Sequence, residues 1–360
     1  MIMNSLTFFA KYEDIGKYGE IRTPFTMDDF KNAGFEYEDT IKVTFLNKEL
    51  IIPYVPSYRC THSGGNVLVG SKMFKTIPIV AFHSNFVKNN RIAVFLENED
   101  RDIDIMVSKD ITFPIRFDLE LYEKKGYSEE FKIYNLIRTN NREDYSDLSD
   151  EEYCNFRTVK GGRIKEGILY RSSSPIDPFM KRNKYADDCL KKYGIKTIVN
   201  LNNHMEDTRH FENYLDTYYS KQNILFLNTN ADVTSYNFGK SVLKAMRFIN
   251  CHEGPYLVHC MEGQDRTGAI CALFESLLSA IKNELIEDFM KTYENFYRVK
   301  KGSEQYYKIV KGEIQEDIAS IRGFSYNTLD ILKNPVSYFR FLDITNDDME
   351  LFIAKMQGKA

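Results

Sequence analysis

Several features that would settle the class of a protein at once are missing from this sequence. No segment approaches the roughly 20 consecutive apolar residues of a membrane-spanning helix, so no integral membrane association is expected. The 48 lysine and arginine residues are fewer than the 52 aspartate and glutamate residues, and the formal net charge is −4. Without a broad basic field, neither duplex nucleic acid nor an anionic membrane is an expected partner. Any anion-binding site must therefore be local.

Metal-binding and disulfide patterns are also missing. The six cysteines include no Cys-x-x-Cys pair, and the six histidines show no His-Glu-x-x-His spacing. We therefore predict no metal, no cofactor and no disulfide scaffold, and a reducing, cytoplasmic compartment fits best. The first residues include Lys11, Glu13 and Asp14, too early for the apolar region of a signal peptide. A secreted form whose leader has been removed stays open.

Length and strand patterns predict two domains, because 360 residues exceed one average domain. Residues 41–58 alternate apolar and polar side chains and end at two prolines, which predicts paired strands. Three more β-rich runs follow at 66–71, 76–84 and 91–98. We expect a small all-β N-terminal domain over residues 1–115, of unknown partner.

A connector and an α/β domain are predicted beyond residue 115. Residues 116–152 have apolar residues at mixed helical spacing and then an acidic stretch, which indicates a helical and acidic connector. From 153 to 360, strands alternate with helices, the pattern of an α/β domain with a central, largely parallel sheet flanked by helices. The predicted strands are 195–202, 223–230 and 255–260, and the predicted helices are 204–220, 238–251 and 266–284.

The segment HCMEGQDRTG, from His259 to Gly268, joins a predicted buried strand directly to a predicted buried helix. A helix N-terminus presents unpaired amides and a positive dipole end, and successive loop amides form an anion-binding concavity. This field and the charge of Arg266 favour the nucleophilic thiolate of Cys260. Five residues between Cys260 and Arg266 let the loop wrap a tetrahedral oxyanion, and Gly263 permits the sharp turn. The segment thus predicts phosphoryl chemistry at a cysteine.

The string HCxxGxxRTG is similar to the signature of cysteine-dependent protein tyrosine phosphatases. Upstream, NFRTVKGG (155–162) and GILYRSSSP (167–175) resemble the opening of a bacterial subgroup that includes lipid-active members. The resemblance covers about residues 153–310. It implies a phosphatase domain that hydrolyses phosphomonoesters through a phosphocysteine intermediate, most closely a protein tyrosine or dual-specificity phosphatase. The alternatives are a phosphoinositide or inositol-phosphate phosphatase and, in another class, a phosphate-binding module without turnover.

Two departures from the subgroup bear on the substrate. Gln264 stands where many members have lysine, and Glu262 adds a negative charge to the loop. A less positive loop favours phosphotyrosine over multiply phosphorylated inositols. The expected partner is a phosphorylated protein or a phosphoinositide.

Roles follow for the residues in and around the loop. Cys260 is the predicted nucleophile, and Arg266 is predicted to hold the phosphate and stabilise the transition state. Thr267 either donates to the sulfur or caps the helix. The phosphate-binding loop comprises Met261, Glu262, Gly263, Gln264, Asp265 and Arg266.

The leaving oxygen needs a proton donor, and two residues are candidates. The subgroup resemblance implies Asp265. Asp232 lies in the loop 228–237, where better-known tyrosine phosphatases keep a mobile acid, although no Trp-Pro-Asp pattern is present.

Supporting roles are predicted for residues outside the chemistry. His259 is expected to order the loop. Arg157 and Arg171 either line or brace the phosphate pocket, or pack the upstream block through ion pairs. Cys271, or another thiol, is the expected resolving partner if Cys260 is oxidised.

Overall fold

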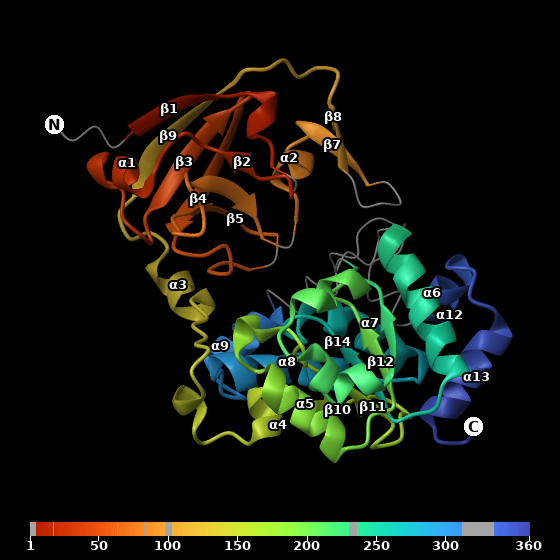
Figure 1. Ribbon diagram of the computed structural model, residues 1–360. Helices are drawn as coiled ribbons and strands as arrows, with labels where there is room; N and C mark the ends of the chain where they lie inside the picture. The colour runs from red at the N-terminus through yellow and green to blue at the C-terminus, as the bar shows by residue number, and fades with distance from the viewer. Residues whose placement is uncertain are drawn as a thin grey trace. The chain divides into compact units, whose positions relative to one another are not determined.

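The computed structural model describes residues 5–16, 18–62, 64–82, 84–97, 103–229, 236–311 and 335–360. The described chain forms two compact units (Figure 1). The first contains the residues up to Leu136 together with 307–311, and the second contains Ile137–Tyr306 and 335–360. The boundary therefore lies about twenty residues beyond the end predicted for the N-terminal domain.

The first unit is built on β-sheet. A seven-stranded sheet has the order β1-β9-β3-β4-β5-β6-β2, and β7 and β8 form a separate two-stranded sheet. The strands are β1 (Ser5–Ala10), β2 (Ile21–Arg22), β3 (Thr40–Phe45), β4 (Lys48–Val55), β5 (Asn66–Val69), β6 (Pro78–Ala81), β7 (Ala93–Glu97), β8 (Ile103–Val107) and β9 (Ile115–Glu123). The unit also contains the short helices α1 (Met27–Asn32), α2 (Phe86–Asn89) and α3 (Ser128–Tyr134), so it is not purely β.

Strand β9 corrects the predicted connector. It pairs antiparallel with both β1 and β3, and its alternate residues Phe117 and Leu119 are buried in the core. The apolar residues after 116 therefore follow a strand period, not the helical spacing expected for this segment. The β3–β4 pair is antiparallel and lies within the run where paired strands were predicted.

The second unit contains a five-stranded sheet in the order β10-β11-β14-β12-β13. Strands β11, β14, β12 and β13 run parallel, and only β10 is antiparallel to its neighbour. The strands are β10 (Arg157–Thr158), β11 (Leu169–Ser172), β12 (Thr197–Asn200), β13 (Asn223–Phe226) and β14 (Tyr256–His259). The helices that begin in this unit are α4 (Asp150–Tyr153), α5 (Asn183–Lys192), α6 (Tyr236–Cys251), α7 (Asp265–Leu277), α8 (Lys282–Tyr297), α9 (Glu304–Ile309), α12 (Pro335–Phe341) and α13 (Asn346–Met356).

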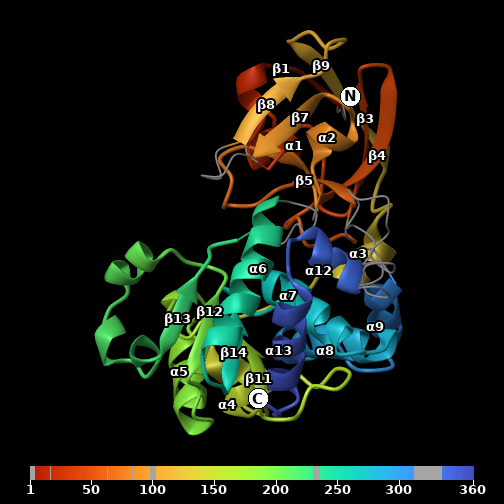
Figure 2. The same cartoon turned by 90° about the vertical axis from the view of Figure 1, so that its right-hand side faces the viewer.

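Helices cover both faces of this sheet (Figures 1 and 2). Val199 and Val258 belong to one hydrophobic cluster, which includes residues of α6, α7 and α13. Their neighbours Ile198 and Leu257 point to the opposite face and pack in a cluster with residues of α5. Such two-sided burial explains why the strand segments read as continuous apolar runs.

The helix predicted over 204–220 is wrong. This segment contains three short 3-10 turns, η4 (Met205–His210), η5 (Tyr214–Asp216) and η6 (Tyr219–Lys221). Asn213 adopts a left-handed conformation with φ 59°, and Thr217 is extended, so a continuous helix is interrupted twice. The aromatic residues here pack against the sheet without helical periodicity.

Within the described ranges, no helix combines the length and the apolar content that a membrane crossing requires.

Candidate active site

The segment HCMEGQDRTG lies at the carboxyl edge of the parallel sheet. Strand β14 ends at His259, and helix α7 begins at Asp265, so the connecting loop contains only Cys260–Gln264. Ser172 of β11 and Asn200 of β12 lie in register beside His259. The loop is therefore flanked by the ends of two neighbouring strands, the usual position of a binding site in an open α/β sheet.

Every carbonyl oxygen from residue 260 to residue 264 accepts a hydrogen bond from a residue that lies outside the loop. The donors are the imidazole of His259 (3.1 Å), the amide of Ser174 (3.0 Å), the side-chain amide of Asn155 (3.3 Å) and the guanidinium of Arg171, which binds the last two oxygens (2.8 and 3.2 Å). In a trans peptide the N–H points opposite to the C=O. The amides of residues 261–265 therefore face the inner side of the loop, as an anion-binding concavity requires.

Gly263 makes the sharp turn of the loop. Its φ of 68° lies in the left-handed region, and a Cβ atom at this position would lie 2.2 Å from the carbonyl oxygen of Ser172. Any other residue would be strained and would also collide with β11. The loop backbone is thus packed directly against the end of the neighbouring strand.

Arg266 lies in the first turn of α7, and its guanidinium is held by the segment after β12. It donates to the carbonyl oxygen of Leu201 (3.1 Å) and to the side-chain oxygen of Asn202 (2.7 Å). Both acceptors are neutral. Among the described residues, no carboxylate forms an ion pair with Arg266, so its charge is available to an anion.

A buried ionic network lies behind the loop. Asp288 of α8 forms ion pairs with both Arg157 (2.8 Å) and Arg171, and Arg171 is completely buried. Burial opposes ionisation of Asp288, but the two guanidinium groups outweigh it and lower the pKa of this carboxyl. Arg171 thus holds two loop carbonyls directly, and Asp288 holds Arg171. Arg157 reaches the loop only indirectly, since it donates to the Asn155 side-chain oxygen (2.7 Å) while the Asn155 nitrogen donates to the Glu262 carbonyl oxygen.

His259 is buried and neutral. Burial lowers the pKa of its imidazole to about 4. Since Nδ1 lies 3.1 Å from the Cys260 carbonyl oxygen, Nδ1 must carry the proton, and Nε2 accepts from the Tyr219 hydroxyl at 3.0 Å. Asn200 in turn donates to the Tyr219 oxygen (3.0 Å). These bonds tie the first peptide group of the loop to β12.

Of the two candidate proton donors, Asp265 and Asp232, the structure describes only Asp265. Asp265 is the first residue of α7 and is half-buried, and no described residue forms a hydrogen bond or ion pair with its carboxylate. Asp232 lies outside the described residues. The hydroxyl of Thr267 is buried without a hydrogen-bond partner among the described residues, so it is available to a ligand or to the sulfur.

The loop is less acidic than the sequence suggested. Glu262 forms an ion pair with Arg138 at 2.9 Å, and both side chains are 16% exposed. The guanidinium of Arg138 also lies over the ring of Phe296. The expectation of a reduced positive charge counted Glu262 but not its partner, which is far away in the sequence.

Several residues of this site received no role from the sequence, among them Asn155, Arg138, Asn202 and Asp288. Asn155 lies in the recognised string NFRTVKGG, so its position carried a signal. Arg138, Asn202 and Asp288 carried none, because tertiary packing alone brings them to the loop.

Two observations bear on the thiols expected to act with an oxidised Cys260. Burial raises the pKa of Cys271 to about 12, which disfavours the thiolate needed for exchange with an oxidised Cys260. The closely spaced sulfurs are those of Cys154 and Cys189, 3.9 Å apart. The described ranges contain no group of three or more His, Cys, Asp or Glu side chains arranged to hold a metal ion.

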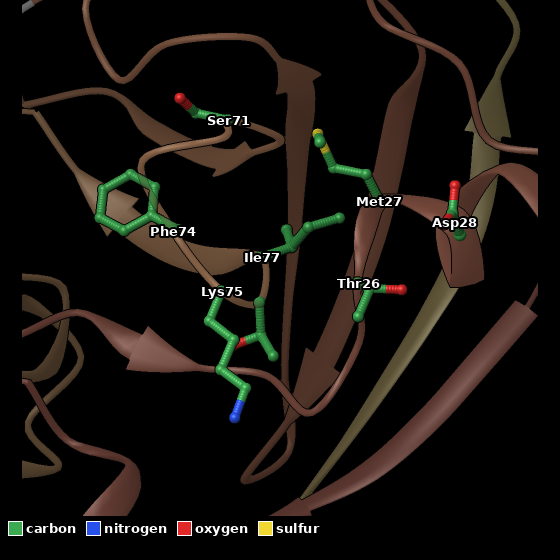
Figure 3. A pocket seen from close by; sticks show the side chains of 8 residues that line it. Thr26, Met27, Asp28, Ser71, Phe74, Lys75 and Ile77 are labelled. Atoms are coloured by element: carbon green, nitrogen blue, oxygen red, sulfur yellow. The ribbon is translucent and has the colours of Figure 1, made fainter.

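A separate cavity of about 140 Å³ lies in the first unit, where the start of α1 meets residues 71–77. Figure 3 shows Met27, Phe74 and Ile77 around it. The described residues that line it include no cysteine, histidine or arginine. None of the residues predicted to act on phosphate lines this cavity.

Comparison with known proteins gives one family match. A model described as the tyrosine phosphatase family matches residues 147–334. None of the curated proteins matches this chain. Among solved structures, the core catalytic domain of the PP-IP phosphatase SIW14 from S. cerevisiae is 18% identical, with 46% of this chain and 91% of that chain covered and a TM-score of 0.29. An uncharacterized conserved protein from Thermotoga maritima is 8% identical, with 32% of this chain and 36% of that chain covered and a TM-score of 0.24.

Proposed function

This chain belongs to the tyrosine phosphatase family, and from that premise we propose that it hydrolyses phosphomonoesters through a phosphocysteine intermediate on Cys260. The outward orientation of five consecutive loop carbonyls carries the proposal. It leaves the loop amides facing inward, next to an arginine without a carboxylate partner among the described residues. Such a loop stabilises the negative charge of a phosphoryl group as that charge develops in the transition state.

The first step transfers the phosphoryl group to the enzyme. The thiolate of Cys260 attacks phosphorus, a sulfur–phosphorus bond forms, and the bond to the ester oxygen breaks. Asp265 gives its proton to the leaving oxygen, and Arg266 and the loop amides bind the three remaining oxygens. Asp265 suits this role because no described residue engages its carboxylate, whereas the environment of Asp232 is not described.

The second step releases phosphate. A water molecule attacks the phosphocysteine, its proton passes to the Asp265 carboxylate, and the sulfur–phosphorus bond breaks to restore the thiolate. The buried hydroxyl of Thr267 stabilises the departing sulfur by donating a hydrogen bond. No cofactor is needed for either step.

Phosphotyrosine in proteins is the first proposed substrate class, with dual specificity included. It rests on the family and on Gln264, which adds no positive charge to the loop. Phosphoinositides or inositol phosphates are the second candidate, because the ion pair between Glu262 and Arg138 compensates the loop's acidic residue. A cytoplasmic location, where phosphorylated proteins are found, belongs to the same proposal.

The test measures phosphate release in EDTA from a phosphotyrosine peptide, a phosphoserine peptide and a dispersed phosphoinositide. The variants are Cys260→Ser and a matched control, Cys251→Ser, which removes an exposed thiol at the end of α6. We expect Cys260→Ser to lose at least about 1000-fold in turnover and Cys251→Ser to retain it. The substrate with the highest kcat/KM indicates which of the two candidate substrate classes is correct.

Two outcomes would contradict the proposal. Turnover that disappears in EDTA would indicate metal-dependent hydrolysis. Phosphate binding by the wild type without turnover on any of the three substrates would favour the phosphate-binding module instead.

A further inference from the structure

The two acceptors that hold Arg266 are both neutral groups. Its guanidinium donates to one backbone carbonyl, that of Leu201, and to one side-chain amide, that of Asn202 at 2.7 Å. Carboxylates are the strongest partners of a guanidinium, yet none pairs with Arg266 among the described residues. The arginine is therefore oriented by neutral groups only.

Asn202 is itself held in place. The side-chain oxygen of Asn200, which is fully buried, accepts from the backbone amides of Asn202 (2.8 Å) and Asn203 (3.1 Å). The side-chain nitrogen of Asn202 donates to the side-chain oxygen of Asn203 (3.2 Å). Because the Asn202 nitrogen is engaged in this way, its oxygen faces Arg266. The end of β12 thus presents a fixed acceptor to the loop.

We infer that Asn202 is a positioning residue that presets the guanidinium of Arg266 and leaves its charge for the phosphoryl group. This inference rests on the proposed function. A carboxylate at the same distance would hold Arg266 in the same orientation, but its charge would compete with the phosphate. A neutral amide orients the arginine without that competition. The asparagine is therefore required for its lack of charge as well as for its shape.

The decisive variant is Asn202→Asp, which keeps the size and the acceptor oxygen and adds one negative charge. We expect its dissociation constant for inorganic phosphate, measured by calorimetry, to rise at least about tenfold, and kcat/KM to fall by a similar factor. Asn202→Ala removes the acceptor that orients the guanidinium of Arg266 but adds no negative charge beside it. We expect its phosphate affinity to change no more than about threefold while kcat falls.

The phosphate affinities of Asn202→Asp and Asn202→Ala, compared with each other, distinguish a positioning role from a purely structural one. If Asn202 only stabilised the fold, the aspartate would weaken phosphate binding no more than the alanine, because both variants lose the donor to Asn203 and aspartate keeps the acceptor for Arg266. Asn223→Asp is the matched control, since Asn223 is an exposed asparagine at the start of β13 and receives the same added charge. Its phosphate affinity and turnover should equal those of the wild type.

Equal phosphate affinity in Asn202→Asp and the wild type would overturn this inference and leave the proposed function standing. Absence of phosphate binding by the wild type would overturn both. A loss in Asn202→Asp that Asn223→Asp shares would also overturn the inference, because net charge alone would then explain it.

Discussion

Glu275, in the last turn of α7, is a buried acid that binds a segment far away in the sequence. It is 1% exposed, and its side-chain oxygen accepts the backbone amide of Gly161 at 3.1 Å. Burial raises the pKa of this carboxyl well above its usual range, and the nearby Asp288 adds to the effect. The folded protein therefore holds Glu275 protonated at pH values where the unfolded chain has released the proton.

A pH dependence of stability follows from Glu275. Because its folded pKa lies above the unfolded value of about 4.3, its contribution to the free energy of unfolding is present below pH 4.3 and is lost as the pH rises. Glu275→Gln keeps an acceptor for Gly161 and has no proton to lose. In urea unfolding, we expect the variant to match the wild type near pH 4 and to exceed it increasingly up to neutral pH, by at most about 1.4 kcal/mol per pH unit.

The control for this measurement is Glu287→Gln, which changes an exposed glutamate on α8. Loss of its exposed ion pair with Lys301 should lower the free energy of unfolding by at most about 1 kcal/mol and never raise it. A Glu275→Gln variant that gains no stability over the wild type between pH 4 and neutral pH would contradict the protonated buried acid.

For single residues, the sequence predicts those whose chemistry depends on their spacing within one short segment. Cys260, Gly263 and Arg266 follow from one ten-residue segment, and the positive φ of Gly263 agrees with the turn expected there. The pairing of Glu262 with Arg138 could not be predicted, because 124 positions separate them and only the folded chain brings them together.

Among the elements, α8 carries the group that joins the upstream strands to the loop. Asp288 on this helix pairs with Arg157 of β10 and Arg171 of β11, and Arg171 then donates to two loop carbonyls. A single carboxylate thus connects one helix, two strands and the phosphate-binding loop.

Asp288→Asn tests this connection. The substitution leaves two buried guanidinium groups without their counter-ion, so we expect a loss of about 3–5 kcal/mol in the free energy of unfolding and a fall in turnover. Glu287→Gln, one position earlier, breaks only an exposed ion pair with Lys301 and should cost at most about 1 kcal/mol. Equal effects of the two substitutions in urea unfolding would contradict the bracing role.

Helices and strands can be predicted where the spacing of apolar residues within the segment determines the structure. Strands β12 and β14 and helix α6 lie where the apolar patterns place them. The helix predicted over 266–284 is too long, because α7 ends at Leu277, Ser279 adopts a left-handed conformation and α8 begins at Lys282. The local pattern does not reveal strand β9, because its partners β1 and β3 lie at least 74 residues earlier in the chain. The sequence predicts a helix over 204–220 because local propensity does not reveal the left-handed Asn213.

The whole chain combines a β-rich unit with an α/β unit of the tyrosine phosphatase family. The family match begins at residue 147, so it covers residues of the second unit and none of the described strands of the first. The chemistry proposed for the chain depends on the second unit, where the loop, its braces and its candidate acid are all found.

The central claim is that phosphorus is bonded to Cys260 during turnover. The most direct measurement is acid quenching of the wild type during hydrolysis of an aryl phosphate, followed by mass spectrometry of the peptide that contains Cys260. We expect one added phosphoryl group on Cys260 in the wild type and none at this position in Cys260→Ser. Steady hydrolysis without a phosphorylated Cys260, retained in Cys260→Ser, would contradict it.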